Sequence, residues 1–177
     1  MEMSIVVEHL LEKPIELFRN GDIDGALANL EETLASNADV PELHHMWAEF
    51  ANMKNMEAQE DVIPGRKIMN AYKMAMELDE ENMEYIADFA SFALECRRIP
   101  VAVKEFQRYA RRLELEDIPV DEVLFTASRN IVDAVEVMDP SRKEAMVQPW
   151  LKQALEWAVG ALGYSTEEAI ATLSSDD

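Results

Sequence analysis

The chain has 177 residues, 49% hydrophobic and 29% charged, which excludes wholesale disorder and suits one domain of ordinary size. Its 36 acidic residues outnumber its 16 basic ones and give a net charge of -20, so it repels nucleic-acid phosphates and anionic membrane surfaces. One cysteine, Cys96, excludes an internal disulfide. With no signal-peptide pattern and no apolar run of about 18 residues, we expect a cytoplasmic protein that neither spans a membrane nor binds nucleic acid.

Apolar residues recur at spacings of three and four along the chain, the period of an amphipathic helix, and no stretch alternates over the length of a strand. The spacing predicts helices over residues 4–18, 24–36, 41–58, 64–79, 83–97, 100–115, 120–138, 141–162 and 166–173. Asp39 with Glu42 fits a capping box at the start of the third of these. The predicted fold class is therefore all-α.

A repeat relates successive pairs of these helices. Leu30 falls on Tyr72 after a shift of 42 positions and on Phe106 after a further 34, and Ala48 falls on Ala90 after a shift of 42. The shift of 42 is 34 plus eight extra residues, which lie between positions 47 and 72. Eight residues are close to two helical turns, so the second helix pair is expected to be longer than its neighbours.

A helix–turn–helix unit with a 34-residue period resembles the tetratricopeptide repeat (TPR). The segments AYKMAMELDEEN (71–82) and NGDIDGALANLEETL (20–34) carry the resemblance. Small residues let the two helices of a hairpin approach, and large ones fill the layer between hairpins. The small positions here are Ala26, Ala48, Ala90 and Ala102, and the large ones are Trp47, Tyr72, Phe89 and Phe106.

The resemblance implies a solenoid of antiparallel helix hairpins with about three degenerate repeats and C-terminal capping helices. We expect three hairpins in residues 1–116, followed in 117–177 by a helical hairpin, a capping helix and a short acidic tail. His44 and Ile86 depart from the repeat pattern, because they stand where a tryptophan is usual.

In TPR proteins the first helix of each hairpin lines a concave face, which binds a segment of a partner protein. The resemblance places on that face Glu12, Glu42, His45, Glu49, Met53, Glu84, Asp88 and Glu95. A face with carboxylates and no Lys or Arg is expected to attract a basic or amphipathic segment. The alternative is that any exposed face of so acidic a chain is acidic.

Six of the sixteen basic residues fall within sixteen positions and form a stripe, here called the basic stripe: Arg97, Arg98, Lys104, Arg108, Arg111 and Arg112. The stripe either pairs with an acidic surface, of a partner or of a second copy, or neutralises the acids of neighbouring hairpins. Trp150 and Trp157 form a second candidate surface for self-association, or else belong to the core.

Signatures of catalysis are missing: the sequence has no phosphate-binding glycine loop, no GxSxG and no CxxC. Three histidines and Cys96 are few ligands for a metal, so we expect no metal site and no cofactor. The predicted function is a non-enzymatic protein–protein interaction module. The alternatives are a dedicated assembly or maturation chaperone for one client protein, and a small helical enzyme that uses a metal or a thiol.

Overall fold

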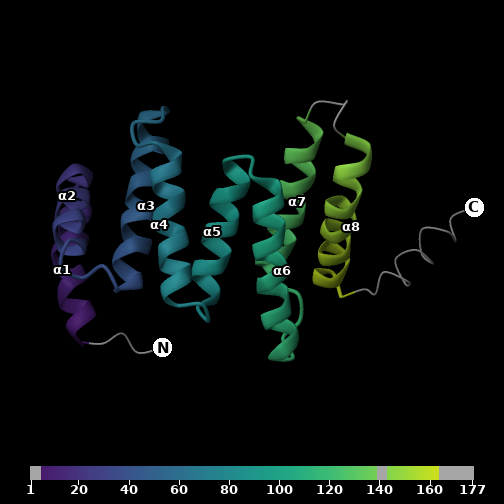
Figure 1. The fold of residues 1–177 in the computed structure, drawn as a ribbon, viewed down its shortest axis with the longest axis horizontal. Helices are drawn as coiled ribbons and strands as arrows, with labels where there is room; N and C mark the ends of the chain where they lie inside the picture. Colours follow the sequence, from purple (N-terminus) through teal and green to yellow (C-terminus); the bar gives the residue numbers. More distant parts are fainter. Residues whose placement is uncertain (1–4, 139–142, 164–177) are drawn as a thin grey trace, which may run out of the picture. The chain divides into compact units, whose positions relative to one another are not determined.

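The computed structural model describes residues 5–138 and 143–163, and the regular structure of this part is entirely helical (Figure 1). Its helices are α1 (Ile5–Arg19), α2 (Ile23–Leu34), α3 (Pro41–Ala58), α4 (Gly65–Leu78), α5 (Met83–Glu95), α6 (Ile99–Leu115), α7 (Glu122–Glu136) and α8 (Lys143–Ala161). The all-α prediction is confirmed. The predicted capping helix over 166–173 and the acidic tail lie outside the described residues.

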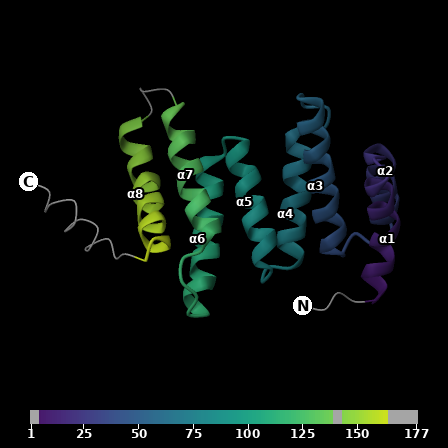
Figure 2. The ribbon, with the colours of Figure 1, turned by 180° about the vertical axis from the view of Figure 1, so that it is seen from behind.

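The chain divides into two compact units, Met1–Tyr85 and Ile86–Asp177. In the first unit α1 packs against α2, α2 against α3, and α3 against α4; in the second, α6 packs against α7 and α7 against α8. Figures 1 and 2 show these successive helices from two opposite sides. From α1 to α7, successive helices are separated by three to six residues, as expected for antiparallel hairpins. None of the described helices is both long and apolar enough to cross a membrane.

The positions assigned to TPR packing all lie in the core. The small residues have no exposed surface, and the large ones are buried almost completely. The fully buried small residues are Ala26, Ala48, Ala90 and Ala102, and the buried large ones are Trp47, Tyr72, Phe89 and Phe106. Burying these apolar groups is the main favourable term for folding, so the repeat register coincides with the core.

Side-chain caps fix several helix starts. The Asp22 side chain accepts a hydrogen bond of 2.8 Å from the backbone N–H of Gly25 and caps α2. At α3 the predicted capping box is wrong: Val40 is the N-cap residue, and no side chain caps the helix there. The reason is Pro41, which takes the first helical position and leaves Asp39 one residue outside the cap.

The second hairpin is longer than its neighbours, as predicted, mainly through its first helix. Helix α3 has 18 residues against 15 in α1 and 13 in α5, whereas α4 has 14, more than the 12 of α2 but fewer than the 17 of α6. Gln59 ends α3 in a left-handed conformation, with φ 54°. The side chain of Asn55 then holds the connecting loop, because its Nδ2 donates to the carbonyl of Ile63 at 2.7 Å and its Oδ1 accepts from the N–H of Ile63 at 2.8 Å.

Candidate partner-binding surfaces

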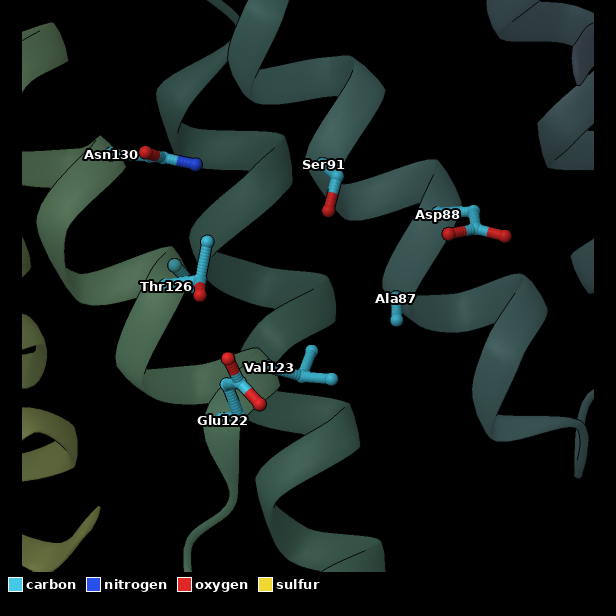
Figure 3. Close-up of a pocket in the computed structure, with 8 residues that line it drawn as sticks. Ala87, Asp88, Ser91, Glu122, Val123, Thr126 and Asn130 are labelled. Carbon is cyan, nitrogen blue, oxygen red and sulfur yellow. The ribbon is translucent and has the colours of Figure 1, made fainter.

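A groove lies between α5 and α7 in the second unit, and its first section is a pocket of about 320 Å³ (Figure 3). The lining residues are Ala87, Asp88 and Ser91 of α5 and Glu122, Val123, Thr126, Ala127 and Asn130 of α7. In Figure 3 Val123 and Asn130 point from α7 toward α5, whereas the carboxylate of Asp88 lies at the outer edge of the pocket and points away from α7. Two carboxylates from different helices therefore flank this pocket.

A second pocket, of about 290 Å³, continues the groove and shares Ser91 and Asn130 with the first. It adds Leu94 and Glu95 from α5 and Asp133 and Ala134 from α7. We call the two sections together the α5–α7 groove. Four of its lining residues carry carboxylates and none is Lys or Arg. A cleft lined by charges of one sign concentrates the electric field, so the negative charge of this groove attracts cations.

The start of α7 is fixed by Asp121. Its Oδ1 accepts a hydrogen bond of 3.1 Å from the N–H of Leu124, which caps the helix, and its Oδ2 accepts one of 2.5 Å from the hydroxyl of Tyr109 on α6. Burial, followed by this hydrogen bond, raises the pKa of Tyr109 above its ordinary value. The contact positions Glu122, the next residue, at the groove.

Helix α8 packs on the same unit through Trp157, which is 4% exposed and meets Phe106 edge-on with ring centroids 6.2 Å apart. Nε2 of Gln107 also donates to Oε1 of Gln153 at 3.0 Å. Trp157 therefore belongs to the core, which was the alternative to a surface for self-association. The exposed apolar side chains of α8 include Leu155, which is 57% exposed.

In the first unit, His45 lies among aromatic rings. Its ring centroid is 4.7 Å from that of Tyr85 and 5.8 Å from that of Tyr72, and its Nδ1 is 3.7 Å from Oε2 of Glu49. His45 is 8% exposed, so it acts first as a packing residue. Glu49 is half-buried on the next turn of the same helix.

Carboxylates surround this aromatic cluster. The pKa of Tyr85 is raised by burial and then by the charges of Glu42, Glu84, Asp79 and Glu49, in that order. Electrostatic influence of this kind requires the carboxylates to lie near the phenol. The structure thus brings together Glu42, Glu49 and Glu84, three of the acids predicted for the concave face, although they lie on two different helices.

The other predicted concave residues are distributed between the two units. Glu12 is exposed on α1, where its Oε2 is 3.2 Å from Nδ1 of His9, and Met53 is exposed on α3. Asp88 and Glu95 belong to the second unit and line the α5–α7 groove.

The basic stripe contains an acid that changes its interpretation. Glu105, which lies inside the stripe, is 6% exposed, and its Oε1 is 3.3 Å from Nζ of Lys104 while its Oε2 is 3.8 Å from Nη1 of Arg108. Two of the six stripe cations therefore neutralise a buried carboxylate of their own helix. Arg97, with φ 57°, and Arg98 lie in the turn between α5 and α6. A role of the stripe in self-association stays a prediction.

Sequence reasoning missed the residues that α7 contributes to the groove, Glu122, Asn130 and Asp133. A signal for the first of them was available: one more shift of 34 positions carries Asp88 to Glu122. Asn130 and Asp133 then follow at helical spacing on the side of α7 that faces α5.

Over the residues that the structure describes, no three side chains of His, Cys, Asp or Glu are grouped so as to hold a metal ion. His9 is exposed, His45 is buried among rings, and His44 Nε2 lies 2.8 Å from the carbonyl oxygen of Ala38. Cys96 is half-buried at the C-terminal end of α5.

Comparison with protein-family models gives no match, and no curated protein matches the sequence. Among solved structures, the crystal structure of MamA, a TPR-like protein, is similar with a TM-score of 0.61, over 94% of this chain and 81% of that one. The sequence identity is 14%, so the likeness concerns the fold. This chain therefore has the TPR-like helical repeat fold that the spacing of its residues predicts.

Proposed function

We propose that this protein is a non-enzymatic interaction module whose α5–α7 groove binds a basic segment of a partner protein. The observation that carries the proposal is the lining of the groove. Asp88, Glu95, Glu122 and Asp133 come from two helices, and no Lys or Arg lies among the lining residues.

The groove walls favour a bound chain segment. Ala87, Ser91, Ala127 and Ala134 are small, so backbone atoms of a ligand can approach the helices closely. Asn130 belongs to both sections of the groove and offers an amide, which donates and accepts hydrogen bonds. A groove formed by packed helices is largely ordered before binding, which lowers the entropic cost of association.

The spacing of the carboxylates sets the spacing of the cations that fit. Asp88 and Glu95 are seven residues apart on α5, or roughly 10 Å along a helix that rises about 1.5 Å per residue. A segment in the polyproline II conformation covers that distance in about three residues, because it rises roughly 3.1 Å per residue, and its three residues per turn return every third side chain to the same side. We therefore expect basic side chains at every third position of the ligand.

The first unit supports the same chemistry. Glu42, Glu49 and Glu84 lie near Tyr85, so a second group of carboxylates lies beside buried aromatic rings there. Carboxylates attract Lys and Arg.

The test uses a fluorescein-labelled, capped 12-residue peptide with Lys at every third position, and measures its affinity by fluorescence anisotropy. The variant Glu122→Gln/Asp133→Asn removes two groove charges, and it is expected to weaken binding about threefold or more. Both residues are exposed, so helicity and the melting temperature should stay at the wild-type values.

The matched control is Glu114→Gln/Glu116→Gln, which removes the same charge from exposed positions in the same unit, outside the groove. It is expected to leave the affinity within about twofold of wild type, as distant exposed charges are screened by salt. Equal weakening by the two double variants would show attraction to the net charge of the molecule, and the groove would not be the binding site.

A further inference from the structure

A groove between α7 and α8, in the second unit, has no part in the proposed function. The two helices pack against each other (Figure 1), and the groove along them has a volume of about 300 Å³. Most of its lining is apolar, and consists of Val132 from α7 and Leu151, Ala154, Leu155 and Ala158 from α8. We call it the α7–α8 groove.

The large apolar side chains of this groove are exposed. Leu155 is 57% exposed, Val132 is 38% exposed and Leu151 is 37% exposed. Apolar side chains that gather around a concave surface, instead of being scattered singly, are typical of an interface. Burial of these side chains against another molecule removes apolar surface from water, which favours association.

The groove is self-complementary in shape. Leu151 and Leu155 lie four residues apart on α8 and form a leucine ridge, and Ala154 and Ala158, also four apart, form an alanine row beside it. Helices most commonly pack with such ridges of each helix inserted between the ridges of the other. A second copy of α8, related by a two-fold axis, places its leucine ridge on the alanine row of the first and receives the first ridge in return.

The charges of the groove are self-complementary as well. Its charged lining residues are Arg129 and Asp133, which lie one turn apart on α7 and are both exposed. Within the described part of the chain, neither of them forms an ion pair. A two-fold axis brings Arg129 of each copy to the side of Asp133 of the other, so a second copy supplies both partners.

The local charge also suits a second copy of so acidic a chain. A net charge of -20 makes two copies repel each other over most of their surface. Helix α8, by contrast, contains two Lys and two Glu, and the groove lining contains one Arg and one Asp. Two copies therefore approach on this face without bringing an excess of negative charge together.

The terminal residues 164–177, which lie outside the described residues, are a less suitable occupant. Their sequence contains four acidic residues and no Lys or Arg. Placed in the groove, they would leave Asp133 without a cation and add like charge beside it. A second copy offers a cation and a carboxylate at once.

From these observations we infer that the α7–α8 groove is the interface of a two-fold homodimer. The leucine ridge of each copy packs on the alanine row of the other, and Arg129 of each copy pairs with Asp133 of the other. The dimer does not depend on the ligand proposed for the α5–α7 groove, although Asp133 lines both surfaces.

Sedimentation equilibrium of the full chain, at concentrations from about 5 to 500 µM, measures the dissociation constant of the dimer. Leu155→Glu is expected to weaken the dimer at least about 100-fold, because both copies lose a buried leucine and bury a charge instead. The matched control is Leu115→Glu, which makes the same change at a residue of α6 that is 80% exposed and lies outside the groove. It is expected to stay within about threefold of wild type. Equal weakening by the two variants would overturn the inference.

Salt distinguishes this interface from self-association through the basic stripe. Raising NaCl from about 0.05 to 0.5 M screens the repulsion between two acidic chains, so a dimer held by apolar contacts becomes tighter. A contact between the basic stripe and an acidic surface becomes weaker under the same change. Weakening of the dimer by salt would therefore overturn the inference.

Further variants test the paired charges and the occupant. Arg129→Gln is expected to weaken the dimer about three- to tenfold, whereas Lys152→Gln, which removes an exposed cation of α8 outside the groove lining, should change it less than about twofold. Equal effects would overturn the two-fold pairing. A chain that stays monomeric at every concentration would overturn the dimer, and dimers that then form in Ile170→Ser/Leu173→Ser would identify the terminal residues as the occupant.

Discussion

The hydroxyl of Tyr109 donates a hydrogen bond of 2.5 Å to Oδ2 of Asp121, the residue that caps α7. One carboxylate thereby caps a helix and fastens it to α6. Tyr109→Phe keeps the ring and removes the donor, and we expect it to lower the free energy of unfolding by about 1.5–3 kcal/mol, the range for hydrogen bonds to charged groups. Urea denaturation followed by circular dichroism measures the change.

A double-mutant cycle separates the stability that comes from the Tyr109–Asp121 hydrogen bond from the stability that Asp121 contributes as the N-cap of α7. Asp121→Asn retains a good N-cap residue but removes the charge that Tyr109 contacts. If the two groups act through their hydrogen bond, the effects of Tyr109→Phe and Asp121→Asn will be less than additive, with a coupling of about 1 kcal/mol. Strictly additive losses would mean that the hydrogen bond adds no stability of its own.

The pKa of Tyr85 predicts how stability depends on pH. Burial and the nearby Glu42 and Glu84 raise it above the ordinary value of 10.0. Above pH 10 the unfolded chain therefore loses the proton while the folded chain keeps it, and the free energy of unfolding falls as the pH rises, by at most about 1.4 kcal/mol per pH unit. Below pH 10 both states are protonated and this contribution is constant.

Tyr85→Phe isolates that contribution from other groups that titrate in the same range. Urea denaturation at pH values from 8 to 11 should show a steeper loss of stability in the wild type than in the variant. The ring contact with His45 survives the substitution, so the comparison at pH 8 measures the effect of removing the neutral hydroxyl, without its ionisation. Parallel curves above pH 10 would contradict the raised pKa.

The repeat register was predictable because equivalent residues recur after 34 positions, or after 34 plus the eight extra residues of the second pair, and burial of Ala48 and Ala90 confirms it. The same spacing did not identify α7 as part of the pattern. A shift of 34 positions carries Ala90 to Leu124, a large residue where a small one is expected, although Leu124 is fully buried and the helix packs normally. In a degenerate repeat a position can therefore stay buried although the size of the residue that occupies it has changed.

The candidate surfaces were predictable only in part, since charge and burial depend on neighbours distant in sequence. The basic stripe stands out in the sequence, but burial of Glu105 within it is set by tertiary packing. Likewise the resemblance that places His45 on the concave face does not indicate its ring contacts with Tyr72 and Tyr85. Asp88 and Glu95 were assigned to a binding face through the resemblance to the TPR, whereas their position opposite α7 depends on tertiary packing.

Because the small residues of the repeat are buried, a larger side chain at one of these positions is expected to destabilise the fold. Ala102 has no exposed surface, so Ala102→Leu would insert three carbons into a packed layer. We expect it to lower the free energy of unfolding by about 1–3 kcal/mol. Val101→Leu enlarges the adjacent, exposed residue and is expected to change stability by less than about 0.5 kcal/mol. Similar melting temperatures for the two variants would contradict the register.

Gly160 and Val120 test how closely α8 approaches the segment before α7. A Cβ on Gly160 would lie 2.9 Å from Cγ2 of Val120, closer than real Cβ atoms come to their neighbours. Alanine stabilises a helix by about 1 kcal/mol relative to glycine. Against this gain, the stiff β-branched side chain of Val120 must be displaced. We therefore expect Gly160→Ala to lower the free energy of unfolding by about 1 kcal/mol in the wild type.

Gly160→Ala should stabilise the protein, instead of destabilising it, once the side chain of Val120 has been shortened. In a Val120→Ala background Cβ of residue 120 remains, 3.4 Å from the added methyl group and in ordinary van der Waals contact, so Gly160→Ala should raise the free energy of unfolding by up to about 1 kcal/mol through helix propensity. Urea denaturation of the four chains in this cycle measures both effects. If Gly160→Ala changed stability equally in the two backgrounds, the two residues would not be in contact, and glycine would be present at this position for another reason.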